Sequence, residues 1–206
     1  MLITYIEVNK NYKTMSKVHL ENNTSFCLPK KRIESLNLEE GKTISDESLE
    51  YILNYEVYDC AKSAAVKYLA LKLRTSYEIR EKLSELGFED VTIDKVIENL
   101  IEIDYINDYQ YACKYISEKI KLQPKSTKML SMELSYKGIP EDDICRAFEE
   151  IDFDEDNIAY ELIKKRFSKY TLFDEKMINK IRSFLLNRGF NFQQISKAIS
   201  KFLPDD

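Results

Sequence analysis

Apolar positions along this chain repeat with a period of 51 residues. Residues 83–88 match residues 134–139, which in turn match residues 185–190, and each segment begins with leucine and carries glycine in its fifth place. The same register continues outside these segments, with isoleucine or leucine at 79, 130 and 181 and isoleucine at 93, 144 and 195. A self-match in one register over three copies indicates a tandem repeat.

Each copy has the pattern of two helices joined at the glycine. In the first copy Ile79, Leu83 and Leu86 lie four and three residues apart, so they share one face of a helix. Gly87 follows, and glycine adopts the left-handed conformation that ends a helix without strain at Cβ. Apolar residues at 93, 96, 97 and 100 then line one face of a second helix. We therefore expect left-handed helix ends at Gly87, Gly138 and Gly189.

A further apolar helix is predicted before each hairpin, over residues 64–73, 111–120 and 159–167. The sequence thus predicts three tandem three-helix units, which span residues 61–108, 109–155 and 156–206. A unit of this size cannot bury its apolar face alone, so neighbouring units should stack. The alternative is one compact helical bundle in which the periodicity is accidental.

Residues 1–60 have a different pattern, with short runs of β-branched and aromatic residues. Residues 3–8, 17–20 and 25–28 are separated by turn-forming segments and predict a three-stranded antiparallel sheet. One face of such a sheet needs a cover, and residues 29–38 and 45–58 can supply helices for it. The predicted fold is mainly α, with tandem three-helix repeats preceded by a small antiparallel β-sheet plus helices.

The composition narrows the class of protein. Of 206 residues, 44% are hydrophobic and 33% are charged, while only 4 are glycine and 4 proline, which argues against an all-β chain. No apolar run reaches the roughly 18 residues that a transmembrane helix needs. Residues 1–7 lack the basic and apolar regions of a signal peptide. We expect a cytoplasmic monomer without a membrane contact.

Residues that could support catalysis or bind a metal are scarce. The four cysteines form no CxxC pair and the single histidine, His19, is not near a cysteine cluster, which argues against a zinc site. The sequence contains no GxxxxGK[ST], GxGxxG or HExxH motif. One histidine also leaves few ways to activate a serine or cysteine nucleophile. We predict no catalytic residue, no metal site, no cofactor and therefore no enzyme.

Charge is distributed unevenly along the chain. The formal net charge is −5, and residues 1–60, 61–108 and 109–155 each carry −3. Residues 156–206 contain ten basic and six acidic residues, a net charge of +4. Lys176, Lys180 and Arg188 lie at multiples of four residues, so a helix would place them on one face. The last unit is therefore the best candidate to contact an anionic partner.

The first unit carries a motif with a charged helix start, a glycine and a polar close. Its residues are Arg74, Ser76, Glu78, Arg80 and Leu83, then Gly87, then Tyr105-Ile106-Asn107-Asp108. Together with the tandem units, this motif resembles the RecX family of RecA-regulating proteins. The N-terminal segment is similar to that of Gram-positive members of the family.

The resemblance implies a modulator of RecA and not an enzyme. It implies binding to RecA–single-stranded-DNA filaments and inhibition of ATP hydrolysis, strand exchange and coprotease activity, in the SOS response and recombinational DNA repair. Basic residues on the three units would pair with acidic RecA surface or with DNA phosphates. The candidates for this contact are Lys72, Arg74, Arg80, Lys82, Lys125, Lys128, Lys137, Lys180, Arg182 and Arg188.

The alternative hypothesis is a helical-repeat module that binds nucleic acid independently of RecA. Such a module predicts an affinity for free single- or double-stranded DNA that falls steeply with salt. Binding to free DNA that is absent or insensitive to salt would argue against it.

Overall fold

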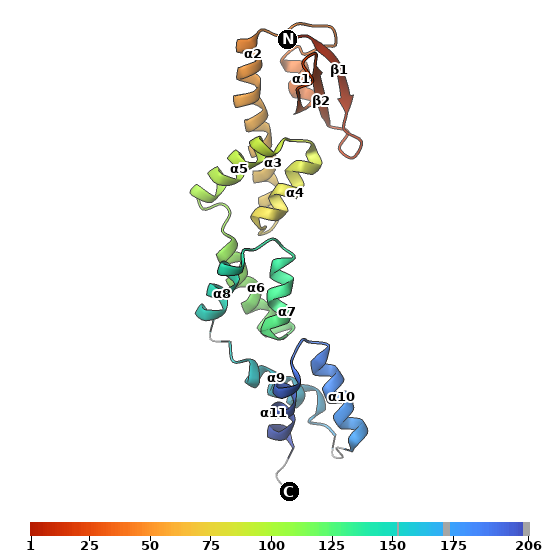
Figure 1. Cartoon of the computed structure of the whole chain (residues 1–206), viewed down its shortest axis with the longest axis vertical. Coiled ribbons are helices and arrows are strands. Elements are labelled where there is room, and N and C mark those ends of the chain that lie inside the picture. The colour runs from red at the N-terminus through yellow and green to blue at the C-terminus, as the bar shows by residue number, and fades with distance from the viewer. Residues whose placement is uncertain (152, 171–173, 204–206) are drawn as a thin grey trace. The chain divides into compact units, whose positions relative to one another are not determined.

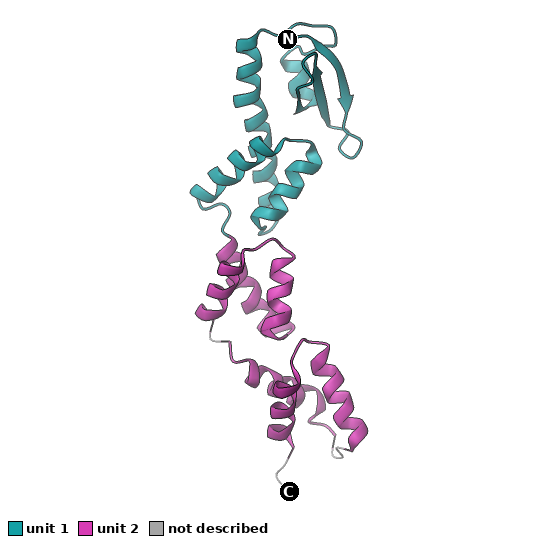
Figure 2. Cartoon of the chain, viewed as in Figure 1, with its two compact units in different colours: residues 1–107 teal, residues 108–206 magenta. Residues whose placement is uncertain are grey.

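The computed structural model describes residues 1–151, 153–170 and 174–203 of the chain (Figure 1). The chain divides into two compact units, residues 1–107 and residues 108–206 (Figure 2). The first unit contains an N-terminal sheet and one three-helix repeat, and the second unit contains two further repeats. This is the mainly helical fold that the periodicity predicts.

The N-terminal sheet has three antiparallel strands in the order β1-β2-β3. The strands are β1 (Ile3–Val8), β2 (Met15–Leu20) and β3 (Ser25–Pro29). Ile3, Val18 and Leu28 are completely buried because one face of the sheet packs into the core of the first unit. The short helix α1 (Lys30–Ser35) follows β3 directly and buries Ile33 in the same core. The predicted antiparallel sheet is confirmed.

One helical stretch connects the sheet to the first repeat. It consists of α2 (Asp46–Tyr51), a π-helical segment η1 (Ile52–Val57) and α3 (Tyr58–Leu69), with no break between them. The sequence predicted separate helices over 45–58 and 64–73, and this is wrong. No proline or glycine occurs between Asp46 and Leu69, so the backbone continues as a helix through the boundary predicted at residue 60.

The first repeat is completed by α4 (Ser76–Leu86) and α5 (Asp90–Glu102). The Thr75 hydroxyl accepts the Glu78 backbone N–H, and the Glu78 carboxylate accepts the Thr75 N–H, so a capping box starts α4. Gly87 ends α4 with φ of +93°, as the sequence predicted. A side chain at this position would be strained, and its β-carbon would lie 2.6 Å from the Cys27 Sγ.

The second and third repeats have the same order of elements. Their helices are α6 (Asp108–Leu122), α7 (Thr127–Ser135) and α8 (Glu141–Glu150), then α9 (Glu155–Phe167), α10 (Glu175–Leu186) and α11 (Phe192–Phe202). Gly138 and Gly189 have φ of +75° and +87°, so the predicted left-handed helix ends are confirmed in both repeats. Each repeat therefore consists of three helices, and Figure 1 shows the helices of each repeat grouped together.

Three separate hydrophobic clusters form the core of the described residues. The first joins the sheet to α4 and α5, the second lies within the second repeat, and the third lies within the third repeat. The repeated leucines Leu83, Leu134 and Leu185 are each 0% exposed, one in each cluster. The 51-residue period therefore marks the residues that hold each repeat together.

The second and third repeats contact each other through the start of α7. Ser126 is the N-cap of α7 and is 0% exposed. Its backbone N–H donates to the Arg188 carbonyl oxygen at 2.9 Å. The Glu155 carboxylate accepts the Thr127 N–H at 3.1 Å and the Thr127 hydroxyl at 2.9 Å. We call this contact the α7–Gly189 junction, because Gly189 packs against Ser126 and Met129.

Among the described residues, no helix is long and apolar enough to cross a membrane. Within that part of the chain, no group of three His, Cys, Asp or Glu side chains is placed to hold a metal ion. The four cysteines are free thiols, buried at Cys27 and exposed at Cys145.

Candidate functional site

Most cations predicted as contacts in the first repeat are engaged within the first unit. The Arg74 guanidinium lies 4.0 Å from the Tyr68 ring centroid and 3.7 Å from the Glu78 carboxylate. Arg80 forms an ion pair with Asp94. These contacts give Arg74 and Arg80 structural partners, whereas Lys72 is exposed.

Lys82 joins the first repeat to the N-terminal sheet. Its ammonium donates to the Tyr12 hydroxyl at 2.5 Å and lies 3.5 Å from the Glu85 carboxylate. The hydrogen bond with Tyr12 is the main reason that the pKa of Lys82 is raised above its ordinary value. The Tyr12 hydroxyl in turn donates to Glu85 at 2.7 Å. Lys82 thus holds the β1–β2 hairpin against α4, which is a structural role.

The three cations predicted in the second repeat have different surroundings. Lys125 forms an ion pair with Glu133, which also accepts the Tyr115 hydroxyl at 2.7 Å. Lys128 is exposed on α7. The Lys137 ammonium lies 5.6 Å from the Tyr111 ring centroid.

The Glu133 network makes stability depend on pH. Burial alone would raise the pKa of Glu133, but hydrogen bonds from Lys125 and Tyr115 outweigh burial and lower it. A lowered carboxyl pKa stabilises the fold above the unfolded-state pKa, and this contribution is lost as pH falls through the folded-state value.

Glu133→Gln should therefore lower the free energy of unfolding by about 1.5–3 kcal/mol at pH 7, the range for a hydrogen bond to a charged group. The difference from wild type should shrink as pH falls below about 4.3, the ordinary glutamate pKa, because the unfolded chain binds the proton more readily than the folded one. Urea unfolding at a series of pH values from 7 to 3 measures the loss of stability at pH 7 and its decrease at low pH. Glu118→Gln, on an exposed position of α6, serves as the control. A Glu133→Gln deficit that does not change with pH would contradict this assignment.

The third repeat arranges its cations around an aromatic ring. The Arg188 and Arg166 guanidinium carbons lie over the Phe184 ring, at 3.9 Å and 4.6 Å from its centroid. The Arg188 Nη1 also donates to the Phe184 carbonyl oxygen at 3.2 Å. Phe184 packs edge-on against Phe167, with 5.5 Å between ring centroids. Helix α9 and the turn after α10 therefore place two guanidinium groups over the same ring.

Two open pockets meet at this pair of arginines. The α10 groove has a volume of about 730 Å³ and is lined by Tyr170, Lys176 and Lys180 together with the two arginines. The second, which we call the junction pocket, has a volume of about 580 Å³. It adds residues 122–125 from the turn before α7 and Lys165 from α9. The basic residues of the two pockets are Lys125, Lys165, Arg166, Lys176, Lys180 and Arg188.

Among the described residues, none that lines either pocket is acidic. Among the described residues, Arg166 and Arg188 have no carboxylate within ion-pair distance, whereas Lys125 pairs with Glu133. Burial, and then repulsion from Arg166, lowers the pKa of Arg188 below its ordinary value. Two like charges held together without a counter-charge are typical of a surface that accepts an anion.

The structure brings together only some of the predicted contact residues. Lys176, Lys180 and Arg188 all line the α10 groove, although Arg188 lies after the end of α10 and not on the helix face that the four-residue spacing predicted. Lys125 and Arg188 line the junction pocket. Arg182 is exposed outside both pockets, where its Nη1 donates to Asn179 at 3.2 Å.

The prediction missed Arg166, although an alignment of the repeats could have found it. Arg166 lies seven residues after Ala159, as Lys72 lies seven after Ala65. Five residues before the repeat glycine, the first two units have Lys82 and Glu133, and the third has Phe184. An aromatic ring in place of a charge at that position is the signal for the arginine pair.

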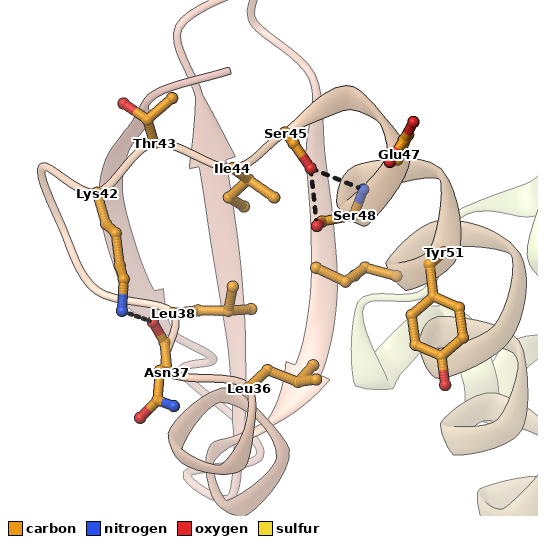
Figure 3. Close-up of a pocket in the computed structure, with 11 residues that line it drawn as sticks. Leu36, Asn37, Leu38, Lys42, Thr43, Ile44, Ser45, Glu47, Ser48 and Tyr51 are labelled. Atoms are coloured by element: carbon orange, nitrogen blue, oxygen red, sulfur yellow. Dashed lines mark hydrogen bonds between the residues drawn. The ribbon is translucent and has the colours of Figure 1, made fainter.

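A further pocket, of about 440 Å³, lies beside the sheet in the first unit. Figure 3 shows the apolar side chains of Leu36, Leu38 and Ile44 along it. Its polar groups bond to each other, with Lys42 donating to the Asn37 carbonyl and Ser45 bonding to Ser48. No predicted contact residue lines this pocket, so the third repeat is the stronger candidate site.

Comparison with known proteins identifies the repeats. Three family models match in chain order: the RecX first three-helix domain at residues 61–100, the second at 107–147 and the third at 154–199. The predicted unit boundaries at 61–108, 109–155 and 156–206 remain predictions.

Full-length relatives and solved structures agree with these matches. A "Regulatory protein RecX" of Clostridioides difficile strain 630 is 30% identical over 100% of this chain and 97% of its own length. Another, from Clostridium perfringens strain SM101, is 28% identical over 99% of this chain and 97% of its own length. The crystal structure of RecX from Lactobacillus salivarius has a TM-score of 0.63 and 29% identity, covering 70% of this chain and 96% of that one. Another regulatory protein RecX structure, at 22% identity, shares the fold with a TM-score of 0.65 over 97% and 98%.

Proposed function

We propose that this chain, which belongs to the RecX family of regulatory proteins, regulates RecA by binding RecA–single-stranded-DNA filaments. Binding would inhibit RecA ATP hydrolysis, strand exchange and coprotease activity. The chain would act in the cytoplasm as a monomer, and it would act by occupying a surface of the filament and not by catalysis.

The observation that carries the proposal is the basic surface of the third repeat, defined by the α10 groove and the junction pocket. Apart from Lys125, which pairs with Glu133, it gathers cations without a carboxylate partner among the described residues, beside aromatic rings, in a chain whose net charge is −5. A RecA–DNA filament presents both DNA phosphates and acidic side chains, and either can pair with these cations. The engaged state of Arg74, Arg80, Lys82 and Lys125 makes them weaker candidates than Lys180 and Arg188.

The alternative function, a nucleic-acid-binding module that acts without RecA, draws on the same surface. It differs in its partner, because it would bind free DNA as tightly as the filament. Measured in one buffer, the ratio of the two affinities distinguishes these functions.

Co-sedimentation with RecA filaments tests the proposal. The wild-type chain should pellet with filaments, and reversal of charge at Lys180, Arg182 and Arg188 should weaken binding by tenfold or more. A variant that reverses Lys95 and Lys114, which are exposed on other repeats, should bind within about twofold of wild type. Equal binding by both variants would remove the third repeat from the interface.

A further inference from the structure

Arg166 and Arg188 are poised to hold an anion between two repeats. Both guanidinium groups rest over Phe184, and neither has a carboxylate partner among the described residues. Stacking on an aromatic ring fixes a guanidinium while leaving most of its N–H donors in the ring plane available. Because these donors are already oriented, an anion would bind with little loss of side-chain freedom.

The cations beyond this pair form a row and not a single point. Lys176 and Lys180 are exposed one turn apart on α10, so their attachment points are separated by about 6 Å along the helix axis. Lys165 adds a further cation to the lining of the junction pocket, next to the arginines. A row of this kind fits a polymer with a regular series of negative charges better than it fits one small anion.

Aromatic exposure in the same groove favours a nucleic acid with unpaired bases. The Tyr170 side chain lines the α10 groove and is 50% exposed. Its ring lies 6.1 Å from Phe167, which supports it from below the surface. An exposed ring beside a basic groove lets a base stack while its phosphates contact the cations. In a duplex the base faces are already stacked and unavailable.

The site also depends on the α7–Gly189 junction. The Arg188 backbone carbonyl accepts the Ser126 N–H, while the Arg188 side chain lines both pockets. Residues 122–125 of the second repeat form one wall of the junction pocket. The wall and the arginine pair therefore face the same space only while the two repeats are docked.

We propose that the α10 groove and the junction pocket form one composite site for the phosphodiester backbone of a single-stranded nucleic acid, completed by docking of the second and third repeats. Arg166 and Arg188 hold a phosphate, Lys176, Lys180 and Lys165 follow the flanking phosphates, and Tyr170 stacks with a base. The proposal rests on the proposed function in one respect, namely that the single strand is the one in a RecA filament. Binding of a single strand by the full chain can be measured without RecA.

The test is fluorescence anisotropy with a labelled 15-nucleotide oligo(dT) strand and the corresponding dT–dA duplex, from low to moderate salt. Wild type should bind the single strand more tightly than the duplex. Arg166→Glu with Lys180→Glu should lower single-strand affinity at least tenfold and make the salt slope shallower by about 1.4, for two lost phosphate contacts. Lys95→Glu with Lys114→Glu reverses the same charge at exposed positions outside both pockets and should change the affinity less than threefold.

Two further measurements separate the contributions. Tyr170→Ala should lower the affinity for the single strand several-fold and leave the affinity for the duplex unchanged. Hydrogen exchange at the Ser126 N–H should slow when oligo(dT) is bound, because a ligand of the docked repeats stabilises their junction.

Two results would overturn the proposal. One is an equal loss of affinity in the groove and control variants, and the other is displacement of oligo(dT) by polyglutamate as effectively as by unlabelled DNA. A wild-type chain that inhibits RecA yet binds no oligo(dT) would overturn it and leave the proposed function standing. Binding of oligo(dT) without any effect on RecA would support it and overturn the proposed function.

Discussion

Leu185→Ala is expected to unfold the third repeat while the first unit stays folded. Leu185 is 0% exposed and lies in the hydrophobic cluster that α9, α10 and α11 form. Truncating a fully buried leucine costs about 2–5 kcal/mol, because the lost contacts leave a cavity. The cluster shares no residue with the core of the first unit, so the loss should stay local.

Hydrogen exchange with resolution along the chain measures this effect. Protection should fall in α9, α10 and α11 and stay near wild type in α4 and α5. Leu186→Ala is the matched control, because the Leu186 side chain is next in sequence and is 40% exposed. Its truncation should lower the free energy of unfolding by less than about 1 kcal/mol. A loss of protection spread evenly over all repeats would favour the alternative of one cooperative bundle.

Gly189→Ala should separate the second repeat from the third. Gly189 has φ of +87°, which costs a residue with a β-carbon about 1–2 kcal/mol. The added methyl group would also collide with the Ser126 hydroxyl and lie 2.9 Å from the Met129 β-carbon. Overpacking of this kind costs a further 1–3 kcal/mol or so, and the simplest relief is to open the α7–Gly189 junction.

Gly41→Ala is the control for this substitution. Gly41 has a similar φ of +81°, but a β-carbon there would meet nothing within 4 Å. It should therefore show the cost of strain alone, measured by urea unfolding. Faster exchange of the Ser126 N–H in Gly189→Ala, and not in Gly41→Ala, would report an open junction. Equal free energies of unfolding for the two variants would show that the contacts around Gly189 contribute nothing to stability.

The repeat architecture could be predicted because the same pattern of apolar residues and glycine occurs three times in the sequence. The leucine and the glycine of each unit occupy positions where only a buried apolar side chain or a left-handed backbone fits, as Leu134 and Gly138 illustrate. The strands were also predictable, since β-branched runs alternate with turns. The continuous helix from Asp46 to Leu69 was missed because the repeat pattern was taken to begin a new element.

The candidate site was only partly predictable from charge. The spacing of Lys176, Lys180 and Arg188 predicted one shared helix face. All three line one groove, but Arg188 lies beyond the end of α10. Counting cations did not reveal which ones have partners. Lys125 pairs with Glu133 eight residues away, although eight residues of continuous helix would separate them by about 12 Å along the axis. The pair forms because Lys125 lies in the turn before α7. The approach of Arg166 to Phe184 requires α9 to pack on α10, which is a tertiary contact.

The central claim is that this chain regulates RecA, and DNA-dependent ATP hydrolysis by RecA from the same organism tests it most directly. RecA on single-stranded DNA would be titrated with the wild-type chain, with the Lys180, Arg182 and Arg188 reversal variant alongside. We expect inhibition by wild type at well below one chain per RecA monomer, and weaker inhibition by the variant. An unchanged rate of hydrolysis at a full equivalent of wild-type chain would contradict the claim.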